Sequence, residues 1–447
     1  MKHLILGAGP AGIIAAETLR KHAPNDEITV VGDEPEAPYS RMAIPYLLIG
    51  NVGKEGTHLR HAADHYTRLR ITLKHGSATA LDTDARSVTL GDGSVLPYDR
   101  LLIATGSSPA KPPIPGIDGP GVHPCWTLAD ARDIMKLARP GARVLQMGAG
   151  FIGCIIMEAL ANRGVKLTVV EMGDRMVPRM MGETAGTMIK QWCETKGVTV
   201  HTGARVEAIE REAAPVVEKG LISKIASAIG LGDDEPPAPA GPMKVRLSTG
   251  VVIEADLVIS ATGVKPNIGF LQDSGVTCLV GVLTDEHLQT NIPGVYAAGD
   301  CAEAFDKICG KTIVSAIQPN AAEQARVAAL NMVGRKTALR GVTQINVLDT
   351  LGLVSASFGQ WDGVPGGQHV ELTDRAAGRH LSLQFSGNRL IGCNSIGWTE
   401  HVGAMRGLVE GQVLLGEWKD RLMRDPTQLM AAYLASAQAQ DAHAHLR

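Results

Sequence analysis

The sequence contains no paired cysteine motif. Its 7 cysteines are odd in number and scattered over 447 residues, and none of them stand in C-x-x-C or another metal-ligand spacing. This excludes an iron–sulfur or zinc motif carried by the chain itself. Scattered, unpaired cysteines are typical of proteins in a reducing compartment.

The sequence also lacks a strong net charge and a long apolar run. The 43 basic and 46 acidic residues leave a formal net charge of -3, which argues against nucleic acid or an anionic membrane as a partner. No uncharged apolar stretch reaches membrane-spanning length, and no cleavage site follows the apolar start of the chain. We therefore expect a cytoplasmic protein whose partners are small molecules or other proteins.

Aromatic residues are few, whereas glycine is abundant. The chain has 5 Phe and 6 Tyr against 51 Gly, and 45% of its residues are hydrophobic. This composition is typical of an α/β enzyme with many tight turns. A chain of this length has room for about three domains.

The chain opens with a short apolar run that ends in G-x-G-x-x-G at Gly7, Gly9 and Gly12. This pattern predicts a buried strand, a tight turn and a closely packed helix whose N-terminus is open to a pyrophosphate. A second predicted strand, residues 28–31, is followed by Asp33, 21 residues after Gly12. A carboxylate near this offset accepts hydrogen bonds from the ribose of a dinucleotide.

The same pattern occurs a second time. A predicted strand at residues 143–147 precedes Gly148, Gly150 and Gly153, and a strand at residues 167–170 ends in Glu171. Each unit also has a later strand that ends in the letters ATG, at residues 104–106 and 261–263. Two such units in one chain predict two dinucleotide-binding folds.

We expect an α/β fold with two Rossmann-like domains and a C-terminal mixed α/β domain. The first domain comprises residues 1–116 and 256–334, and the second, inserted into it, residues 117–255. The C-terminal domain, residues 335–447, is expected to act as an interface domain. Its pattern predicts short strands, a hairpin across residues 386–389 and two helical stretches near residues 400–415 and 418–437.

Residues 213–243 form an insertion in a predicted hairpin of the second domain. They contain an amphipathic run, LISKIASAIGL at residues 221–231, followed by an acidic, proline-rich run. Loop closure costs only ~0.6 kcal/mol per doubling of loop length, so such an insertion is tolerated. It is either a surface loop or a helix that docks a partner subunit.

The order of these motifs, together with TNIPGVYAAGD at residues 290–300, resembles the flavoproteins of the pyridine nucleotide-disulfide oxidoreductase superfamily. The resemblance covers nearly the whole chain, and DEPEAPYSR at residues 33–41 is similar to the ferredoxin, rubredoxin and nitrite reductase type. It implies that FAD binds to the first domain, through Gly7, Gly9, Pro10, Ala11, Gly12, Asp33, Glu34, Arg41, Ala78, Thr105, Gly106, Gly299, Asp300, Ile317 and Gln318. For Gln318, a surface or capping role is the alternative.

In the second unit the resemblance implies a site for NAD(H), formed by Gly148, Gly150, Phe151, Ile152, Gly153, Glu171 and Gly263. The Glu171 carboxylate would accept a hydrogen bond from a 2′-hydroxyl and repel a 2′-phosphate, which favours NADH over NADPH. Arg175 and Arg179 follow closely, so NADPH is not excluded.

The sequence departs from the family pattern at the residues that would carry thiol chemistry. The first 124 residues contain no cysteine, so the flavin-adjacent pair of the disulfide reductases is missing. Relatives with one reactive cysteine place it in a run like C-G-x-P-Y, which here begins with Met42 and ends with Tyr46. A thioether cannot form the thiolate that this chemistry requires. We therefore expect no catalytic side chain and no metal site.

A second departure concerns a lysine and glutamate pair that many relatives place beside the flavin. The matching positions here are Tyr46 and Ile155. Glu158 lies one helical turn beyond Ile155, so we consider Tyr46 and Glu158 as candidates for tuning the flavin.

These observations favour an FAD-dependent NAD(H):acceptor oxidoreductase. Hydride transfer between NADH and FAD needs mainly distance and orientation, and without a thiol the expected acceptor is an iron–sulfur or other one-electron redox protein. The pattern, with YLLIG at residues 46–50, is similar to the FAD subunits of phenylglyoxylate dehydrogenase and tungsten aldehyde oxidoreductase complexes, which implies a hetero-oligomer. The alternatives are a stand-alone NADH-dependent rubredoxin or ferredoxin reductase, and a non-catalytic flavoprotein that senses NADH.

Overall fold

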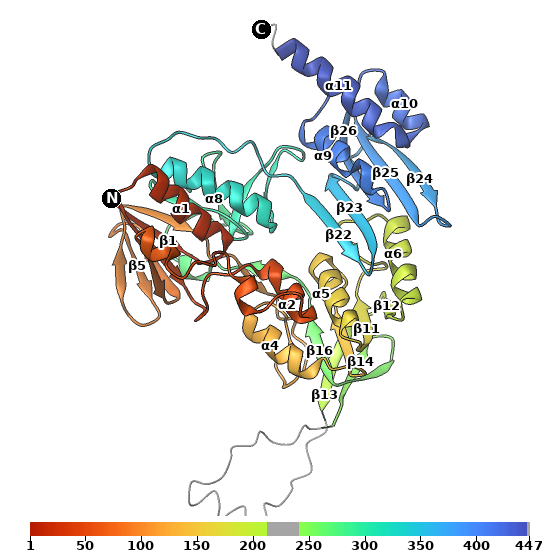
Figure 1. The fold of residues 1–447 in the computed structure, drawn as a ribbon, viewed down its shortest axis with the longest axis horizontal. Coiled ribbons are helices and arrows are strands. Elements are labelled where there is room, and N and C mark those ends of the chain that lie inside the picture. The colour runs from red at the N-terminus through yellow and green to blue at the C-terminus, as the bar shows by residue number, and fades with distance from the viewer. Residues whose placement is uncertain (212–240, 445–447) are drawn as a thin grey trace, which may run out of the picture.

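The computed structural model describes residues 1–211 and 241–444, which fold into three parts (Figure 1). The amphipathic run predicted at residues 221–231 lies outside the described residues, so neither interpretation of the insertion is tested. None of the helices in the described ranges combines the length and the apolar character that crossing a bilayer requires.

The first part is built on a parallel five-stranded sheet of order β19-β7-β1-β2-β3. Its strands are β1 (Lys2–Leu6), β2 (Glu27–Gly32), β3 (Ile71–His75), β7 (Arg100–Ile103) and β19 (Val295–Ala297). Because β19 comes late in the sequence, the chain leaves this sheet after β7 and returns to it.

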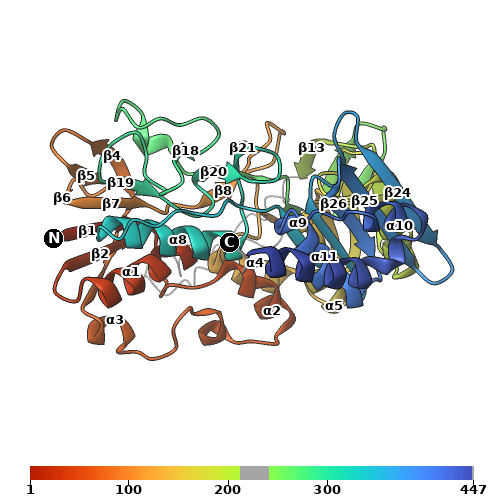
Figure 2. The same cartoon turned by 90° about the horizontal axis from the view of Figure 1, so that it is seen from above.

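Each face of this sheet is covered by a different layer. Helices α1 (Pro10–His22) and α8 (Gln318–Met332) lie side by side on one face (Figure 2). The opposite face packs against an antiparallel sheet of β4 (Ala78–Asp82), β5 (Ser87–Leu90) and β6 (Val95–Pro97). Side chains alternate along β1, so Ile5 faces the helices whereas Leu4 and Leu6 face the small sheet.

The second part repeats this arrangement. Its parallel sheet has the order β12-β11-β10-β16-β9, with β9 (Val122–His123), β10 (Arg143–Met147), β11 (Lys166–Glu171), β12 (Thr199–Thr202) and β16 (Leu257–Ser260). Helices α4 (Leu128–Leu137), α5 (Phe151–Asn162) and α6 (Glu183–Thr195) share the core on one face. Strands β13 (Val206–Arg211), β14 (Met243–Leu247) and β15 (Val252–Ala255) form the other layer. The two predicted Rossmann-like folds are confirmed.

The two connections between these parts pair with each other. Strands β8 (Ser107–Pro109) and β17 (Val264–Pro266) are antiparallel, and each begins directly after one of the ATG motifs. The described residues of the first two parts also contain these short elements: η1 (Arg41–Ala43), α2 (Ile44–Ile49), η2 (Lys54–Thr57), α3 (His65–Arg68), η3 (Gly269–Leu271), β18 (Val282–Leu283), β20 (Ala302–Asp306) and β21 (Lys311–Val314).

The third part is an antiparallel five-stranded sheet with helices on one side. The strand order is β22-β23-β26-β25-β24, with β22 (Ile345–Thr350), β23 (Leu353–Gly359), β24 (Gln368–Asp374), β25 (Arg379–Ser386) and β26 (Arg389–Ile396). The predicted hairpin is confirmed, since Ser386 pairs with Arg389. Helix α9 (Val402–Glu410) follows η4 (Thr399–His401) and packs against the sheet.

One prediction for this third part is wrong. The stretch near residues 418–437 is not a single helix, because α10 (Trp418–Arg424) ends before Pro426 and is followed by η5 (Pro426–Gln428) and α11 (Leu429–Ala444). Proline cannot supply the N–H that would continue α10, and it disfavours the helical conformation of the residue before it. Asp425 accepts hydrogen bonds from the backbone N (3.0 Å) and Oγ1 (2.6 Å) of Thr427, which starts the next turn instead.

Candidate functional site

Both glycine turns leave no room for a side chain at their first and third glycines. Gly7 has a φ of +115°, and a Cβ atom there would lie 2.0 Å from the carbonyl oxygen of Ala104. A Cβ at Gly12 would lie 1.9 Å from the carbonyl oxygen of Gly7. Gly148 repeats the arrangement, with a φ of +93° and a Cβ position 2.3 Å from the carbonyl oxygen of Ala261. Each turn therefore packs its backbone directly against the ATG motif of its own unit.

Both turns also leave the N-terminus of the next helix open. Gly9 precedes α1 and Gly150 precedes α5, and neither helix has a side-chain cap. A Cβ at either glycine would meet no described atom within 4 Å. Unpaired N–H groups at the positive end of a helix dipole bind phosphate. Both turns therefore fit the pyrophosphate of a dinucleotide.

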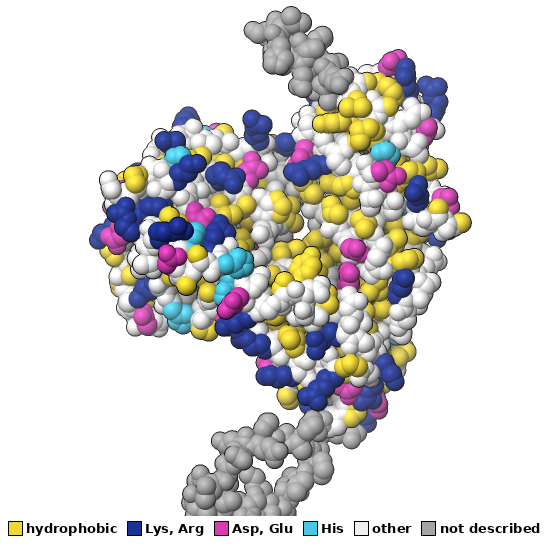
Figure 3. Space-filling view, viewed as in Figure 1, with side chains coloured by type: hydrophobic (Ala, Val, Ile, Leu, Met, Phe, Trp, Pro, Cys, Tyr) yellow, Lys and Arg dark blue, Asp and Glu magenta, His cyan; other side chains and the backbone are white. Residues whose placement is uncertain are grey.

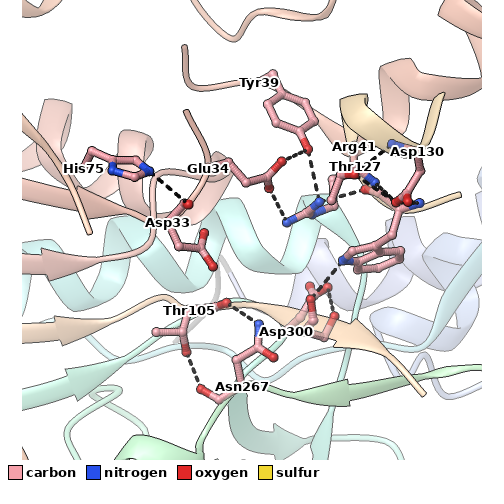
Figure 4. Close-up of polar contacts among 12 residues, drawn as sticks. Asp33, Glu34, Tyr39, Arg41, His75, Thr105, Thr127, Asp130, Asn267 and Asp300 are labelled. Carbon is pink, nitrogen blue, oxygen red and sulfur yellow. Dashed lines mark hydrogen bonds and ion pairs between the residues drawn. The ribbon is translucent and has the colours of Figure 1, made fainter. Parts of the chain in front are cut away.

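Acidic and basic side chains meet at the carboxyl end of β2. Glu34 accepts hydrogen bonds from the hydroxyl of Tyr39 (2.7 Å) and from Nη2 of Arg41 (2.8 Å), as Figure 4 shows. Burial raises the pKa of Tyr39, so its hydroxyl remains a donor. The Asp33 carboxylate is exposed and makes no hydrogen bond within the described residues, which leaves its oxygens free to accept from a ligand.

Asp300 lies in the interior of the first part, beside the crossing strands. Its Oδ2 accepts a hydrogen bond from Oγ of Ser107 (3.0 Å), and burial raises the pKa of this carboxyl group. Nearby, Thr105 and Asn267 exchange two hydrogen bonds: the threonine hydroxyl donates to the Asn267 carbonyl oxygen (2.7 Å), and Asn267 Nδ2 donates to the Thr105 carbonyl oxygen (3.0 Å). These contacts fix the first ATG segment, which includes Gly106 with its φ of +67°.

The remaining predicted FAD residues lie at the ends of other elements. Ile317 is the N-cap residue of α8, and Gln318 begins that helix and accepts a hydrogen bond from Oγ of Ser40 (2.8 Å). Gly299 donates its N–H to Oε1 of the fully buried Gln324 (2.7 Å). Ala78 starts β4 in the small antiparallel sheet.

The second part contains a cleft of about 970 Å³. All seven residues predicted for NAD(H) line it: Gly148, Gly150, Phe151, Ile152, Gly153, Glu171 and Gly263. The structure therefore brings the whole predicted set to one concave surface, which is large enough for a dinucleotide.

Glu171 is held firmly at the end of β11. Its Oε2 accepts from the backbone N of Ala149 (2.7 Å) and its Oε1 from the backbone N of Gly173 (2.8 Å). Arg179 lines the same cleft. Arg175 instead pairs with Asp174 (2.7 Å) and donates from Nε to a backbone carbonyl (2.9 Å).

Several cleft residues were missed in the sequence analysis. The cleft is also lined by Trp126 from the segment before α4, by Asn346 of β22 and by cationic side chains, namely Lys111, Arg205 and Lys265. Gln146 of β10 lies beneath the glycine turn: it is fully buried, and its Nε2 donates to the carbonyl oxygens of Gly148 (2.9 Å) and Gly153 (3.0 Å). A polar residue inside an otherwise apolar strand was the available signal for Gln146.

The two candidates for flavin tuning lie on different elements. Tyr46 on α2 is 55% exposed. Glu158 on α5 lies near Asp349 of β22, and burial together with that negative charge raises the pKa of Glu158. Within the described residues no hydrogen bond joins Tyr46 to Glu158, so the structure does not form a substitute pair from them.

The seven cysteines all lie in the described ranges, and none forms a disulfide. Burial raises the pKa of every one of these thiols, to about 12 for Cys125 and Cys193. Cys301 follows Asp300 but is fully buried, and its Sγ contacts the carbonyl oxygens of Ile103 (3.4 Å) and Ala298 (3.5 Å). These thiols therefore stay protonated near neutral pH.

Comparison with known protein families decides the classification. The family described as pyridine nucleotide-disulphide oxidoreductase matches residues 1–329, which include both dinucleotide-binding parts. The chain belongs to this family. It is an FAD-dependent NAD(P)H oxidoreductase, with FAD and NAD(H) as cofactors.

Individual relatives in this family cover nearly the whole chain. The chain is 32% identical over 429 residues to the NADH-dependent phenylglyoxylate dehydrogenase subunit epsilon of Aromatoleum evansii, a match that covers 95% of each protein. It is 30% identical over 405 residues to rhodocoxin reductase of Rhodococcus erythropolis, covering 89% of this chain and 86% of that one. These matches confirm the predicted resemblance.

A solved structure shares the complete fold. In the covalent putidaredoxin reductase-putidaredoxin complex, the matching chain has a TM-score of 0.85 over 98% of this chain and 99% of that chain, at 22% identity. The C-terminal sheet and helices are therefore part of the shared architecture.

Proposed function

We propose that this protein transfers electrons between NAD(H) and an iron–sulfur protein, as the flavin subunit of a multisubunit oxidoreductase. The observation that carries the proposal is the pairing of two dinucleotide sites with thiols that are all buried or protonated. When bound, FAD accepts a hydride from NADH and releases electrons one at a time. Without a reactive thiol, no cysteine of the chain can form a covalent intermediate during the reaction.

The role of the protein is to bind and orient. The turn at Gly7 to Gly12 and the start of α1 would hold the FAD pyrophosphate, Asp33 its adenosine ribose, and Asp300 its ribityl or phosphate portion. Asp300 would do so as an acceptor held in place by Ser107. The cleft beside Gly148 would take NAD(H), with Glu171 fixed toward the ribose by two backbone amides.

The relatives support an iron–sulfur partner and a place in a complex. The relative that this chain matches over 95% of both lengths is named as a subunit of phenylglyoxylate dehydrogenase. Rhodocoxin reductase and the chlorobenzene dioxygenase ferredoxin reductase component are named for redox partners. In this proposal the partner contacts the third part, residues 335–447. FAD binds to residues 1–116 with 256–334, and NAD(H) binds to residues 117–255. The free cysteines suit a cytoplasmic location.

Purification of the native protein tests the complex. We expect other polypeptides and iron to elute with the flavin, and NADH to reduce the iron–sulfur centres of that assembly anaerobically. A flavoprotein that elutes alone, without iron, and reduces an added rubredoxin or ferredoxin would instead support the stand-alone reductase. A flavin that stays oxidised in excess NADH would support the non-catalytic sensor.

A further inference from the structure

Trp126 lies between the two proposed cofactor sites. It lines the cleft that contains Gly148 and Glu171. Its indole Nε1 donates a hydrogen bond to the carbonyl oxygen of Ser107 (3.0 Å), and the hydroxyl of Ser107 donates to Asp300 (3.0 Å). A single residue therefore separates the indole in the NAD(H) cleft from the carboxylate proposed to hold FAD.

The indole is also held from its other side. The guanidinium carbon of Arg41 lies 5.1 Å from the centroid of the Trp126 ring, which is within the range of a cation–π contact. Nη1 of the same arginine donates to the carbonyl oxygen of Trp126 (2.7 Å), and its Nη2 is bound to Glu34 (2.8 Å). The backbone N of Trp126 donates to Asp130 (3.0 Å). Backbone and ring are therefore both fixed.

The backbone before Trp126 is strained. Cys125 is fully surrounded by the core and adopts a φ of +55°, a conformation that costs a residue other than glycine free energy. Trp126 itself remains half-buried, with part of its surface on the cleft. A tryptophan that only filled the core would not need to reach this surface.

We propose that Trp126 forms a wall of the NAD(H) site and contacts the bound dinucleotide with its indole. Arg41 and Ser107 hold the indole, and Ser107 also holds Asp300. The position of the NAD(H) site is therefore fixed relative to that of the FAD site. This inference deepens the proposed function and rests on its NAD(H) site, but it does not depend on which protein accepts the electrons.

The test is a titration of the oxidised holoprotein with NAD⁺, which binds without reducing the flavin. W126L removes the ring and is expected to weaken NAD⁺ binding about two- to twelvefold, the range that corresponds to one aromatic contact. W126F keeps a ring but loses the hydrogen bond to Ser107, so it is expected to bind NAD⁺ more tightly than W126L. Isothermal calorimetry measures the dissociation constants, and the flavin absorbance spectrum verifies that each variant retains FAD.

Trp192 provides a matched control. Its indole N–H also donates to backbone carbonyl oxygens, those of Thr350 and Leu351 (both 3.1 Å), and Lys196 lies 4.3 Å from its ring centroid. It is not among the cleft residues. W192L and W192F should therefore leave NAD⁺ affinity unchanged.

Tryptophan fluorescence adds a readout that does not depend on the leucine variant. We expect NAD⁺ to quench tryptophan emission in the wild type and in W192F, and this quenching to disappear in W126F. Wild-type affinity in W126L, W126F binding as weak as W126L, or undiminished quenching in W126F would each overturn the inference. A wild type that binds no NAD⁺ would instead contradict the proposed function.

Discussion

The two glycine turns differ at one supporting residue. In the second unit, Gln146 donates both hydrogens of its amide to the carbonyl oxygens of Gly148 and Gly153. The first unit has Ile5 at the matching position, two residues before its first glycine, where a Cβ at Gly12 would contact it. The turn at Gly148 is therefore held by side-chain hydrogen bonds, whereas the turn at Gly7 has an apolar side chain at the matching position.

Replacing Gln146 with methionine, Q146M, should weaken NAD⁺ binding. The change keeps an apolar chain of similar length but removes both hydrogen bonds from the amide to the turn, which together contribute about 1–3 kcal/mol net. Calorimetry should show a loss of roughly tenfold in NAD⁺ affinity, with FAD content unchanged. Loss of FAD, or unchanged NAD⁺ affinity, would show that Gln146 does not support this turn.

We predict that Glu171 sets the preference between the two nicotinamide cofactors. E171Q removes the negative charge that a 2′-phosphate would face, in a cleft that Arg179 and Arg205 already line. We expect the ratio of kcat/KM for NADH to that for NADPH to fall roughly tenfold, which corresponds to about 1.4 kcal/mol of charge repulsion.

Glu207 lines the same cleft and supplies the control for this experiment. It belongs to β13, outside the strand–turn–helix unit proposed to hold the ribose, so E207Q should change the ratio little. Equal effects of E171Q and E207Q on the ratio would indicate a general charge effect rather than recognition of the ribose.

At the scale of elements, helix α1 is tied to the segment around α3 by one ionic cluster. Glu17 of α1 accepts two hydrogen bonds from Arg60 (both 2.6 Å), and Nε2 of His65 lies 2.8 Å from the same carboxylate. Burial opposes ionisation of Glu17, but the hydrogen bonds outweigh it and hold its pKa below the ordinary value of 4.5. The contribution of this cluster is present above pH 4.5 and is lost as the pH falls through the lowered pKa.

E17Q should therefore lower the thermal midpoint at pH 7, by an amount that reflects about 1 kcal/mol for a partly exposed pair. The difference from the wild type should shrink as the pH falls below 4.5. Scanning calorimetry at several pH values measures the difference in thermal midpoint between E17Q and the wild type. The control is E27Q, which changes an exposed glutamate on β2. A difference that stays constant down to acidic pH would contradict the ionic contribution.

Local pattern was sufficient to predict some elements but not others. The strands and turns around Gly7 and Gly148 were predicted because short-range sterics decide them. The break between α10 and α11 was readable at Pro426 but was missed. Trp126 and Asn346 could not be assigned to the cleft, because they come from a connecting segment and from the C-terminal sheet. Trp126 reaches the cleft through the path of the segment between β9 and α4, and Asn346 reaches it through the packing of the third part against the second.

At the scale of the whole molecule, the three parts enclose a hollow rich in apolar side chains (Figure 3). The crossing strands β8 and β17 join the two Rossmann-like parts, and β22 of the third part reaches the cleft beside Gly148 through Asn346. The C-terminal part therefore contributes a residue to this cleft and shares a hydrophobic core with the second part.

Because the seven free thiols have raised pKa values, we predict that thiol chemistry plays no part in turnover. Alkylating the holoprotein with iodoacetamide should modify only the half-buried Cys278 and Cys309, and NADH-dependent reduction of the flavin should continue at an unchanged rate. Mass spectrometry locates the modified residues. Activity that falls in proportion to alkylation of one cysteine would place a thiol in the reaction.

Anaerobic stopped-flow mixing of the purified holoprotein with NADH tests the central claim most directly. We predict that the visible absorbance of the flavin bleaches within the turnover time, without the long-wavelength band that a thiolate beside oxidised flavin produces. An oxidised flavin spectrum that persists in excess NADH would contradict the assignment of this chain as an NAD(H) oxidoreductase.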